Sequence, residues 1–214
     1  MKILVAGFDP FGGEHINPAY QAVKQLPSQI QSAEIIKLEI PTSFAGSVKT
    51  MEQAIAQYQP DIVLNVGQAG GRSCMTVEKV AINLADARIP DNDGQQPIDQ
   101  PLCQEGATAY FSTLPVKAMV EEMRKNGIPA NVSYTAGTYV CNSIMYHVLH
   151  LTQTKYQNIR AGFIHVPYES GQAVAKPNGT PFMSLEMIAK GLQSAIVAVI
   201  NHQTDSKIAM GELH

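Results

Sequence analysis

Short runs of aliphatic and β-branched residues recur along the chain, and each run stops at glycine, proline or polar residues. The first run covers residues 2–8 and stops at Asp9-Pro10. Apolar runs without polar alternation are typical of strands that are buried on both faces of a sheet. Later runs of the same kind predict four more strands, at residues 34–40, 61–66, 131–135 and 161–166.

Between these runs, apolar residues recur at the spacing of one helix face. This spacing predicts helices at residues 19–26, 44–58, 116–126 and 142–151. It also predicts a last helix at 184–201, whose apolar face consists of Leu185, Ile188, Leu192, Ala195, Ile196 and Val199. Strands that alternate with helices predict the α/β class, with a largely parallel, twisted sheet covered on both sides. In that architecture, ligands bind at the carboxyl ends of the strands.

Two stretches do not follow this alternation. Residues 77–84 predict another strand, and the Pro and Asn-Asp-Gly residues of 87–94 predict turns or a hairpin after it. Residues 167–183 are rich in proline and glycine and lack periodicity, which predicts a long loop of the kind that is usually functional or mobile. No repeat or linker divides the chain, so residues 1–214 are expected to form a single domain with a flexible tail at 203–214.

The amino-acid composition indicates which kinds of binding partner the chain can have. Of the 214 residues only 15% are charged, against about 25% in a typical domain, so much of the surface must be uncharged or buried against a partner subunit. The net charge is -3 and no run of Lys or Arg occurs, which argues against nucleic acid as a partner. The first apolar run is too short for a signal peptide and no later run approaches the ~20 residues of a membrane span, so a cytoplasmic location is expected.

The chain has three cysteines, Cys74, Cys103 and Cys141. An odd count without CxxC spacing predicts neither a disulfide framework nor a zinc ribbon. Cys141 follows a predicted strand and a Gly-Thr turn and comes just before the helix predicted from residue 142. At that place the helix dipole and free backbone N–H groups lower the pKa of a thiol and can hold an oxyanion, as a nucleophile requires. The alternative is a small buried residue that caps the strand, the interpretation favoured for Cys74 and Cys103.

A thiol nucleophile needs a base, and His165 is the histidine best placed to supply one. It lies at the carboxyl end of the predicted strand 161–166, and the ends of neighbouring parallel strands can bring it within hydrogen-bonding reach of Cys141. His147 and His150 are three residues apart on one predicted helix, but no second pair or suitably spaced carboxylate follows. Packed or exposed helix histidines are therefore favoured over a metal site.

The third member of such a site would be a carboxylate that fixes the imidazole. Spacing alone does not choose among the five carboxylates near predicted strand ends, which are Asp9, Glu78, Asp86, Asp91 and Asp93. Glu78 begins an otherwise apolar strand, where its charge is either paired or exposed to solvent at the strand end. The glycines of residues 67–72 and the pair Gly12-Gly13 offer backbone to a ligand, but they match neither the P-loop nor the dinucleotide fingerprint, so no nucleotide site is predicted.

Six blocks of sequence stand out when these candidate residues are taken with their neighbours. In order along the chain they are GFDPFGGEHINP (7–18), VGQAGGR (66–72), EKVAIN (78–83), ARIPDN (87–92), TAGTYVCN (135–142) and GFIHVP (162–167). Together they resemble the pyroglutamyl peptidase I family, also called pyrrolidone-carboxylate peptidases. The blocks are spread over residues 7–167, so the resemblance covers most of the chain.

The resemblance implies a three-layer α/β/α fold like that of the nucleoside phosphorylases, and a cysteine peptidase that removes an N-terminal pyroglutamyl (5-oxoproline) residue from peptides. It implies a cytoplasmic homotetramer without cofactor or metal. Cys141 would be the nucleophile, His165 the general base and acid, and Glu78 the residue that orients the histidine. Arg88 and the backbone N–H of Cys141 would stabilise the oxyanion. The pocket would be lined by Phe8, Phe11, Gln68, Ile89, Tyr139 and Val140.

The chemistry of pyroglutamate agrees with this set of residues. It is a neutral, compact lactam without an α-ammonium group, so aromatic faces and a few backbone hydrogen-bonding groups can hold it. Phe8 and Phe11 would supply such faces, or else pack as core residues at a strand end. Thiolate attack on the amide carbonyl would form a thioester, which water then hydrolyses.

The chain also departs from the family pattern at a few positions. Tyr139 stands where Phe is common, so that its hydroxyl needs a partner if buried, Lys79 stands where Arg is common, and the loop 73–77 has different spacing residues. Two other classes of function compete with the peptidase. One is a small-molecule binding domain that has lost turnover, and the other is a nucleoside phosphorylase, for which the sequence offers no phosphate-binding motif.

Overall fold

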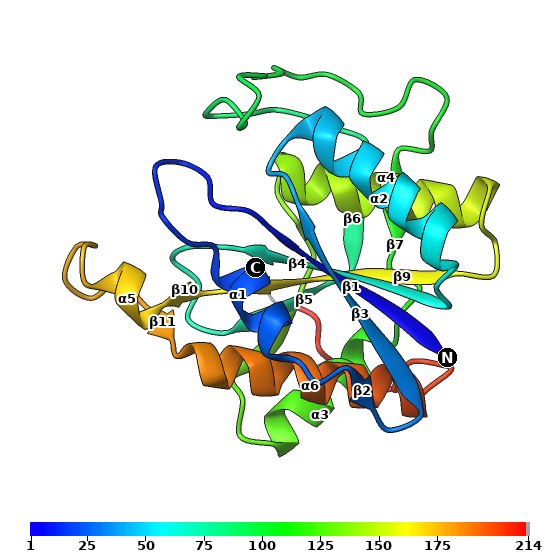
Figure 1. Cartoon of the computed structure of the whole chain (residues 1–214), viewed down its shortest axis with the longest axis vertical. Coiled ribbons are helices and arrows are strands. Elements are labelled where there is room, and N and C mark those ends of the chain that lie inside the picture. The colour runs from blue at the N-terminus through cyan, green and yellow to red at the C-terminus, as the bar shows by residue number, and fades with distance from the viewer. Residues whose placement is uncertain (213–214) are drawn as a thin grey trace.

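A seven-stranded sheet runs through the centre of the protein in the computed structural model, which describes residues 1–212 (Figure 1). From edge to edge its strands are β2 (Gln29–Ile30), β3 (Ala33–Ile40), β1 (Lys2–Phe8), β4 (Ile62–Gln68), β9 (Arg160–Val166), β5 (Met75–Glu78) and β8 (Ala130–Ser133). Neighbouring strands are parallel except at the pairs β2–β3 and β5–β9. The predicted mostly parallel sheet is confirmed.

Helices cover both faces of this sheet. Alternate residues of β1 point to opposite faces, so that Ile3 and Val5 join one core while Leu4 and Ala6 join the other. The first core is closed by α1 (Pro18–Gln25), α3 (Val116–Lys125) and α6 (Leu185–Asn201), and the second by α2 (Phe44–Tyr58) and α4 (Val140–Thr154). The α/β class and its layers are therefore confirmed, whereas the likeness to the nucleoside phosphorylase fold stays a prediction.

Local signals place most helix ends close to the predicted bounds. The side chains of Asn17, Ser43 and Ser184 accept hydrogen bonds from backbone N–H groups in the first turns of α1, α2 and α6. The exception is α4, which begins at Val140, two residues before its predicted start. None of the helices in residues 1–212 combines the length and the hydropathy that crossing a bilayer requires.

The single strand predicted at 77–84 is wrong, because the chain leaves the central sheet at Lys79. The Lys79 N–H donates to the Ser133 carbonyl (2.8 Å), and the Lys79 carbonyl accepts from the Ser112 N–H (2.9 Å). Beyond this point β6 (Val80–Ile82) pairs with β7 (Ala109–Phe111) in an antiparallel ribbon beside α4. Glu78 is thereby the last residue of β5 and stays in the central sheet.

The turns predicted at 87–94 are confirmed. The Gly94 N–H donates to the Asp91 carbonyl (3.0 Å), and Gly94 has a φ of +81°, which a residue without a side chain adopts readily. The segment forms no hairpin of its own. A bridge between Ala85 and Gln100 closes the base of the excursion instead.

The segment 167–183 contains regular structure where a long loop without periodicity was predicted. Strand β10 (Tyr168–Glu169) pairs with β11 (Phe182–Met183), and the short helix α5 (Ser170–Ala173) lies between them. A capping box stabilises this turn of helix, because the side chains of Glu169 and Gln172 each bond to the backbone of the other. The expectation of one long loop is therefore wrong at these elements, whereas residues 174–181 carry no helix or strand.

The C-terminal segment carries no helix or strand from 203 to 212, yet it contacts the body of the molecule. Asp205 accepts hydrogen bonds from the N–H groups of Lys117 (2.8 Å) and Ala118 (3.1 Å) at the start of α3, which has no side-chain cap of its own. The Tyr134 hydroxyl donates to the Met210 carbonyl (3.3 Å). Residues 213–214 of the predicted flexible tail lie outside the described residues.

Candidate active site

A cavity of about 160 Å³ lies at the carboxyl ends of β1, β4 and β9, next to the start of α4. This is the edge at which an α/β sheet is expected to bind its ligand. The residues that line the cavity are Phe8, Phe11, Asn17, Thr42, Gln68, Ala136, Tyr139, Cys141 and His165. The structure thus brings the predicted cysteine and histidine to one cavity with four of the predicted pocket residues.

Cys141 is the second residue of α4, inside the helix rather than just before it as predicted. The N-cap residue Tyr139 forms no side-chain cap, so the first-turn N–H groups of α4 are available near the sulfur. The sulfur packs against Gly67 of β4, where an added Cβ atom would lie 2.8 Å from Sγ. Gly67 is the register partner of His165 in β9. Because Gly67 has no side chain, there is room for the Cys141 sulfur beside β9, the strand that carries His165.

The imidazole of His165 is held from behind by Glu78. The ring atom Nδ1 lies 2.7 Å from Glu78 Oε1, and both side chains are buried, with exposed fractions of 5% and 0%. The antiparallel pairing of β5 with β9 makes this contact possible, because it sets Thr76 opposite His165 and Glu78 opposite Phe163, diagonally across from the histidine. With Nδ1 bound to a carboxylate, Nε2 is the ring nitrogen left for the cavity.

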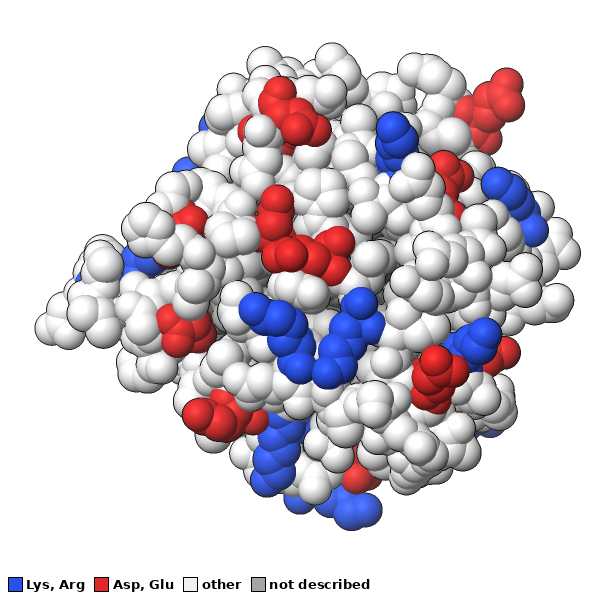
Figure 2. Space-filling model, viewed as in Figure 1, with Lys and Arg blue, Asp and Glu red and all other residues white. Residues whose placement is uncertain are grey.

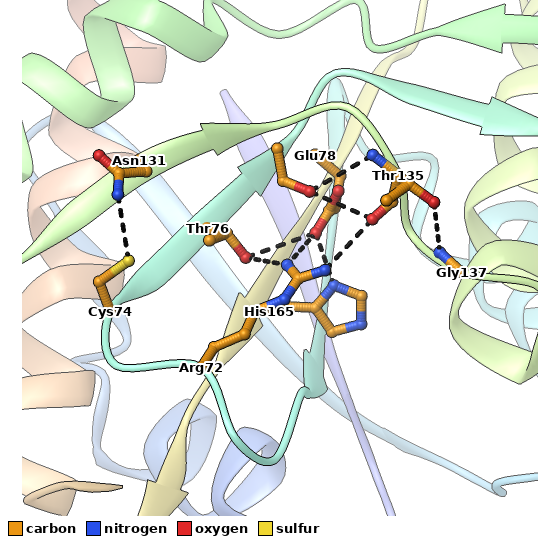
Figure 3. Close-up of polar contacts among 9 residues, drawn as sticks. Arg72, Cys74, Thr76, Glu78, Asn131, Thr135, Gly137 and His165 are labelled. Atoms are coloured by element: carbon orange, nitrogen blue, oxygen red, sulfur yellow. Dashed lines mark hydrogen bonds and ion pairs between the residues drawn. The ribbon is translucent and has the colours of Figure 1, made fainter. Parts of the chain in front are cut away.

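Arg72 is a member of this cluster that the sequence analysis missed. Its Nη1 lies 2.6 Å from Glu78 Oε1 and also contacts the Thr76 hydroxyl, and its Nη2 donates to the Thr135 carbonyl at 3.2 Å (Figure 3). With the Thr76 hydroxyl, which donates at 3.4 Å, three donors meet at Glu78 Oε1, whereas Glu78 Oε2 is buried without a hydrogen-bond partner among residues 1–212. A buried carboxylate in an apolar strand needs a positive partner, and that rule was the available signal for Arg72.

The surroundings of Glu78 keep it ionised. Burial by itself would raise the pKa of this carboxyl, but the hydrogen bond and charge of His165 and the charge of Arg72 outweigh burial, and the pKa lies below its ordinary value of 4.5. A carboxylate that is charged at neutral pH can fix the tautomer of the imidazole and stabilise its protonated form.

The pKa of the Cys141 thiol differs from the prediction. Burial raises the pKa of its thiol to about 12, and the charge of Glu78 acts in the same direction while Arg72 opposes it. The predicted lowering of this pKa is therefore wrong, because the loss of water around the sulfur outweighs the effect of the helix N-terminus. At neutral pH the resting sulfur keeps its proton, so a base must remove that proton as the sulfur attacks.

The remaining predicted pocket residues lie outside the cavity lining. Val140 is buried in the core beneath α4, and Ile89 is 44% exposed. Arg88 is exposed, next to Ile89 on the segment 86–90, and the Asp86 N–H joins this segment to the Thr138 carbonyl (3.0 Å). The segment thus runs beside the cavity without closing it.

The extra hydroxyl of Tyr139 donates to the Pro90 carbonyl at 3.0 Å, in an exposed hydrogen bond. Burial, followed by the charge of Asp91, raises the pKa of this phenol to about 12, so it stays a neutral donor. The ring packs against Phe11 and Phe44, with centroids 6.3 Å and 5.5 Å away. Asn17, Thr42 and Ala136 complete the lining and were not anticipated, although Asn17 and Ala136 lie in the blocks 7–18 and 135–142.

The other carboxylates considered do not contact His165. Asp91 accepts a hydrogen bond from the backbone at the start of α2, and Asp9 accepts one from the backbone just before it. Asp93 bonds to the serine that caps α2, and Asp86 is exposed. Asp91 and Asp93 thus fasten their segment to the start of α2, and Asp9 fastens the loop after β1 to the residue two positions before that helix.

The other histidines and cysteines considered lie away from the cavity. His147 Nδ1 contacts a carbonyl of its own helix at 2.8 Å, and His150 Nδ1 lies 2.9 Å from the Tyr110 hydroxyl. Cys74 contacts an asparagine side chain at 3.4 Å, and Cys103 packs beside the core under α4. Within residues 1–212, no three His, Cys, Asp or Glu side chains are grouped so that they could hold a metal ion.

Comparison with known proteins agrees with the geometry. A family model described as pyroglutamyl peptidase matches residues 1–202. A pyrrolidone-carboxylate peptidase of Clostridium perfringens is 58% identical over 99% of both chains, and one of Enterococcus faecalis is 58% identical over 100% of both. The crystal structure of pyroglutamyl peptidase I from Bacillus amyloliquefaciens matches with a TM-score of 0.94 and 45% identity, over 97% of this chain and 99% of that one. A pyrrolidone carboxyl peptidase from Thermococcus litoralis gives a TM-score of 0.93 and 40% identity, also over 97% and 99%.

Proposed function

This chain belongs to the pyroglutamyl peptidase family and is a cysteine peptidase that removes N-terminal pyroglutamate, and we propose that Cys141, His165 and Glu78 carry its chemistry. The observation that supports this assignment is that a sulfur and an imidazole line the same cavity, and that the imidazole is backed by a buried carboxylate at 2.7 Å. No other cysteine of residues 1–212 lines this cavity.

The lactam ring of the substrate would lie between the aromatic side chains of the cavity. Phe8, Phe11 and Tyr139 supply apolar faces, and none of the lining residues is a carboxylate. Such a pocket suits a neutral ring and disfavours the free ammonium of an ordinary peptide N-terminus, which would lose its water without gaining a charged partner.

Catalysis would begin with transfer of the thiol proton from Cys141 to His165 Nε2 as Sγ bonds to the amide carbonyl carbon. The carbonyl oxygen becomes an oxyanion, which the Cys141 backbone N–H at the start of α4 stabilises. Collapse of this intermediate breaks the carbon–nitrogen bond, and His165 gives its proton to the leaving amine. Water then attacks the resulting thioester, which releases pyroglutamate and restores the thiol.

Glu78 would act through the histidine and not on the substrate. Its carboxylate holds Nδ1, so that the imidazole presents Nε2 to the sulfur and its positive charge is balanced while it carries the extra proton. Because the resting thiol is neutral, this support matters most in the transition state, when the imidazolium and the oxyanion exist together.

Three residues outside the cavity lining complete the proposal. Arg88 would supply a second oxyanion donor from the segment 86–90 when substrate is bound. Ile89 would cover the ring at the rim of the cavity, since its Cδ1 lies near the loop of Gly12, one residue after Phe11. Val140 would hold the first turn of α4 in place from the core.

The direct test is release of a fluorophore from a pyroglutamyl amide by the wild type and by Cys141→Ser. Turnover should fall at least ~10³-fold, because the serine hydroxyl is a much weaker nucleophile in this setting. Cys103→Ser is the matched control, since it removes a thiol outside the cavity and should retain full turnover. Equal rates for Cys141→Ser and the wild type would overturn the assignment.

We also infer that the chain works as a homotetramer in the cytoplasm. Apolar side chains that stay largely exposed are typical of subunit contacts, and Val174, Ile98, Phe111 and Phe182 are 87%, 70%, 65% and 56% exposed. Most of the surface visible in Figure 2 is uncharged, in line with the 15% of charged residues. Three free thiols suit a reducing compartment. Sedimentation velocity and cell fractionation test these two inferences, and a monomer or an exported protein would contradict them.

A further inference from the structure

The side chain of Gln172 connects the cavity to the segment 167–183. Gln172 lies on α5, is 6% exposed, and its Nε2 is 3.0 Å from Oε1 of Gln68, the cavity residue that ends β4. The same nitrogen faces two more oxygens, Glu14 Oε2 at 3.2 Å and the Ile16 carbonyl at 3.4 Å. Gln172 of α5 therefore contacts the side-chain amide of Gln68, which lines the cavity.

The orientation of the Gln172 amide is fixed by its own partners. Its Oε1 accepts a hydrogen bond from the Glu169 N–H (3.2 Å), while its backbone N–H donates to Glu169 Oε1 (2.7 Å). On the other side stand a carbonyl and the carboxylate of Glu14, and both can only accept. Hydrogen bonds from Lys176 and Gln172 lower the pKa of Glu14 despite its partial burial, so this carboxylate is charged at neutral pH. The atom of Gln172 that faces them must be the nitrogen.

This orientation dictates the orientation of the Gln68 amide. An NH₂ group on Gln172 must meet an acceptor, so the end of Gln68 that faces it is the carbonyl oxygen. The NH₂ group of Gln68 is then the end turned away from Gln172. It has no acceptor among residues 1–212, and Gln68 shares the cavity lining with the aromatic rings of Phe8 and Phe11. Two N–H donors are thus available to whatever fills the cavity.

We propose that Gln172 is a positioning residue for substrate specificity: it holds Gln68 with its NH₂ group toward the bound ring, where that group pairs with the ring carbonyl of the lactam. This inference rests on the proposed function. A proline ring has the same size, but it lacks the carbonyl and carries donors of its own, so it would leave the Gln68 donors unpaired. Sites built to bond a polar group reject analogues that lack it far more strongly than apolar pockets discriminate by shape.

A change of Gln172 to glutamate tests this orientation with almost no change of shape. A carboxylate at residue 172 accepts hydrogen bonds, so Gln68 should turn its NH₂ group toward it and present its carbonyl oxygen to the cavity. Because Glu14 stands beside it, the substitution is made in the Glu14→Gln background, and the double variant is compared with Glu14→Gln alone. This comparison avoids a pair of facing carboxylates.

The readout is kcat/KM for a pyroglutamyl amide and for the matching prolyl amide. Relative to Glu14→Gln, Gln172→Glu in that background should lower the pyroglutamyl value about 10- to 100-fold, mainly through KM, and leave the prolyl value unchanged or higher. The single variant Gln172→Met, which removes the polar contact but keeps the length of the side chain, should lose about 3- to 10-fold. An unchanged ratio of the two substrates in both variants would overturn the proposal.

Lys176→Met is the control for simple loosening of the segment. Lys176 pairs with Glu14 and lies 4.9 Å from the centre of the Tyr168 ring, but it makes no contact with Gln68. This variant should keep the substrate ratio of the wild type within about twofold. A loss equal to that of the Gln172 variants would show that loosening suffices, and would overturn the proposal. Alkylation of Cys141 by iodoacetamide without substrate should be equally fast in all folded variants.

The outcomes separate this inference from the proposed function. A wild type that cleaves no pyroglutamyl amide would remove the proposed function and this inference together. A wild type that cleaves it through Cys141, with a substrate ratio that Gln172 does not influence, would remove this inference alone.

Discussion

Two cavities lie at opposite ends of the same strands, and they differ in what surrounds them. The cavity at the amino ends of β4 and β9 is the larger, about 380 Å³ against about 160 Å³. Loop residues such as Pro60, Tyr156 and Asn158 line it, and its carboxylate, Asp61, is bound by the Lys2 N–H at 2.6 Å. The smaller cavity holds the sulfur and the imidazole. Volume alone therefore does not identify the site.

The direction of the helices explains the difference. The larger cavity borders the last residues of α2 and α4, where unpaired carbonyl groups repel negative charge. The smaller cavity borders the first residues of α4, where N–H groups without a side-chain cap attract it. Hydrolysis of an amide passes through an oxyanion, so only the end of the sheet with helix N-termini favours that reaction.

The largest expected difference between the two cavities is a difference in kcat between the variants His165→Asn and Asn158→Ala. The first removes the base of the smaller cavity, and kcat for a pyroglutamyl amide should fall roughly 10³- to 10⁴-fold. The second truncates a residue of the larger cavity and should leave kcat within about twofold. Steady-state kinetics of the two purified variants decide the point. A comparable loss in both would mean that the larger cavity takes part in catalysis.

A smaller loss is expected for Glu78→Gln, which keeps the size of the side chain but removes its charge. The amide no longer balances an imidazolium at Nδ1, so kcat should fall roughly 10²- to 10³-fold while KM changes little. Arg72 also loses its charged partner. Full activity of Glu78→Gln in steady-state assays would contradict the role given to this carboxylate.

The same substitution should change how stability depends on pH. The pKa of Glu78 is lower in the folded chain than its ordinary value of 4.5, so its contribution is fully present above that pH and is lost as the pH falls through the lower, folded pKa. Urea unfolding of the wild type should therefore become steeply easier below about pH 4.5. In Glu78→Gln this part of the acid dependence should be absent, and an unchanged acid dependence would contradict the pKa shift.

Gly67→Ala tests the contact that makes room for the sulfur. The new Cβ would lie 2.8 Å from Cys141 Sγ and 2.7 Å from a ring carbon of Phe163, so overpacking should cost about 1–3 kcal/mol of stability. Displacement of the sulfur should lower kcat roughly 10- to 100-fold. Gly162→Ala is the matched control, because its Cβ would meet Ser112 Oγ at 2.7 Å, outside the cavity. It should lose similar stability and keep kcat, and equal losses of kcat would contradict the account.

The smallest effect is expected for Tyr139→Phe. The change removes the hydroxyl that donates to the Pro90 carbonyl but keeps the ring that lines the cavity. Loss of one hydrogen bond should lower the free energy of unfolding by about 0.5–1.5 kcal/mol, with kcat/KM within about threefold. Chemical denaturation and steady-state kinetics measure the two quantities. A large kinetic loss would show that the hydroxyl acts on the substrate.

Much of the fold was readable from the sequence because the strands are buried on both faces. Ile3, Leu4, Val5 and Ala6 all face a core, which produces the continuous apolar run that predicts β1. The break at Lys79 was not readable, because hydrogen bonds to residues more than 30 positions away cause it. The order of strands in space is likewise a property of the whole chain.

The candidate site, like the fold, could be predicted from the sequence only in part. Cys141 follows a predicted strand and His165 lies at the end of one, so both were identified from local sequence. The choice of Glu78 among five carboxylates depends on the antiparallel pairing of β5 with β9, which no local pattern encodes. Arg72 was missed although it lies only six residues from Glu78, because its contact with the carboxylate needs the turn that precedes β5. The pKa of the thiol was wrongly predicted because it depends on burial, which only the packed structure defines.

The most direct test of the central claim is to map alkylation of the native enzyme by iodoacetamide with peptide mass spectrometry while turnover of a pyroglutamyl amide is followed. The account predicts that loss of turnover parallels labelling of Cys141, and that added pyroglutamate slows both, whereas labelling of Cys74 and Cys103 follows neither. Complete labelling of Cys141 with turnover intact, or labelling of Cys141 that pyroglutamate does not slow, would contradict it.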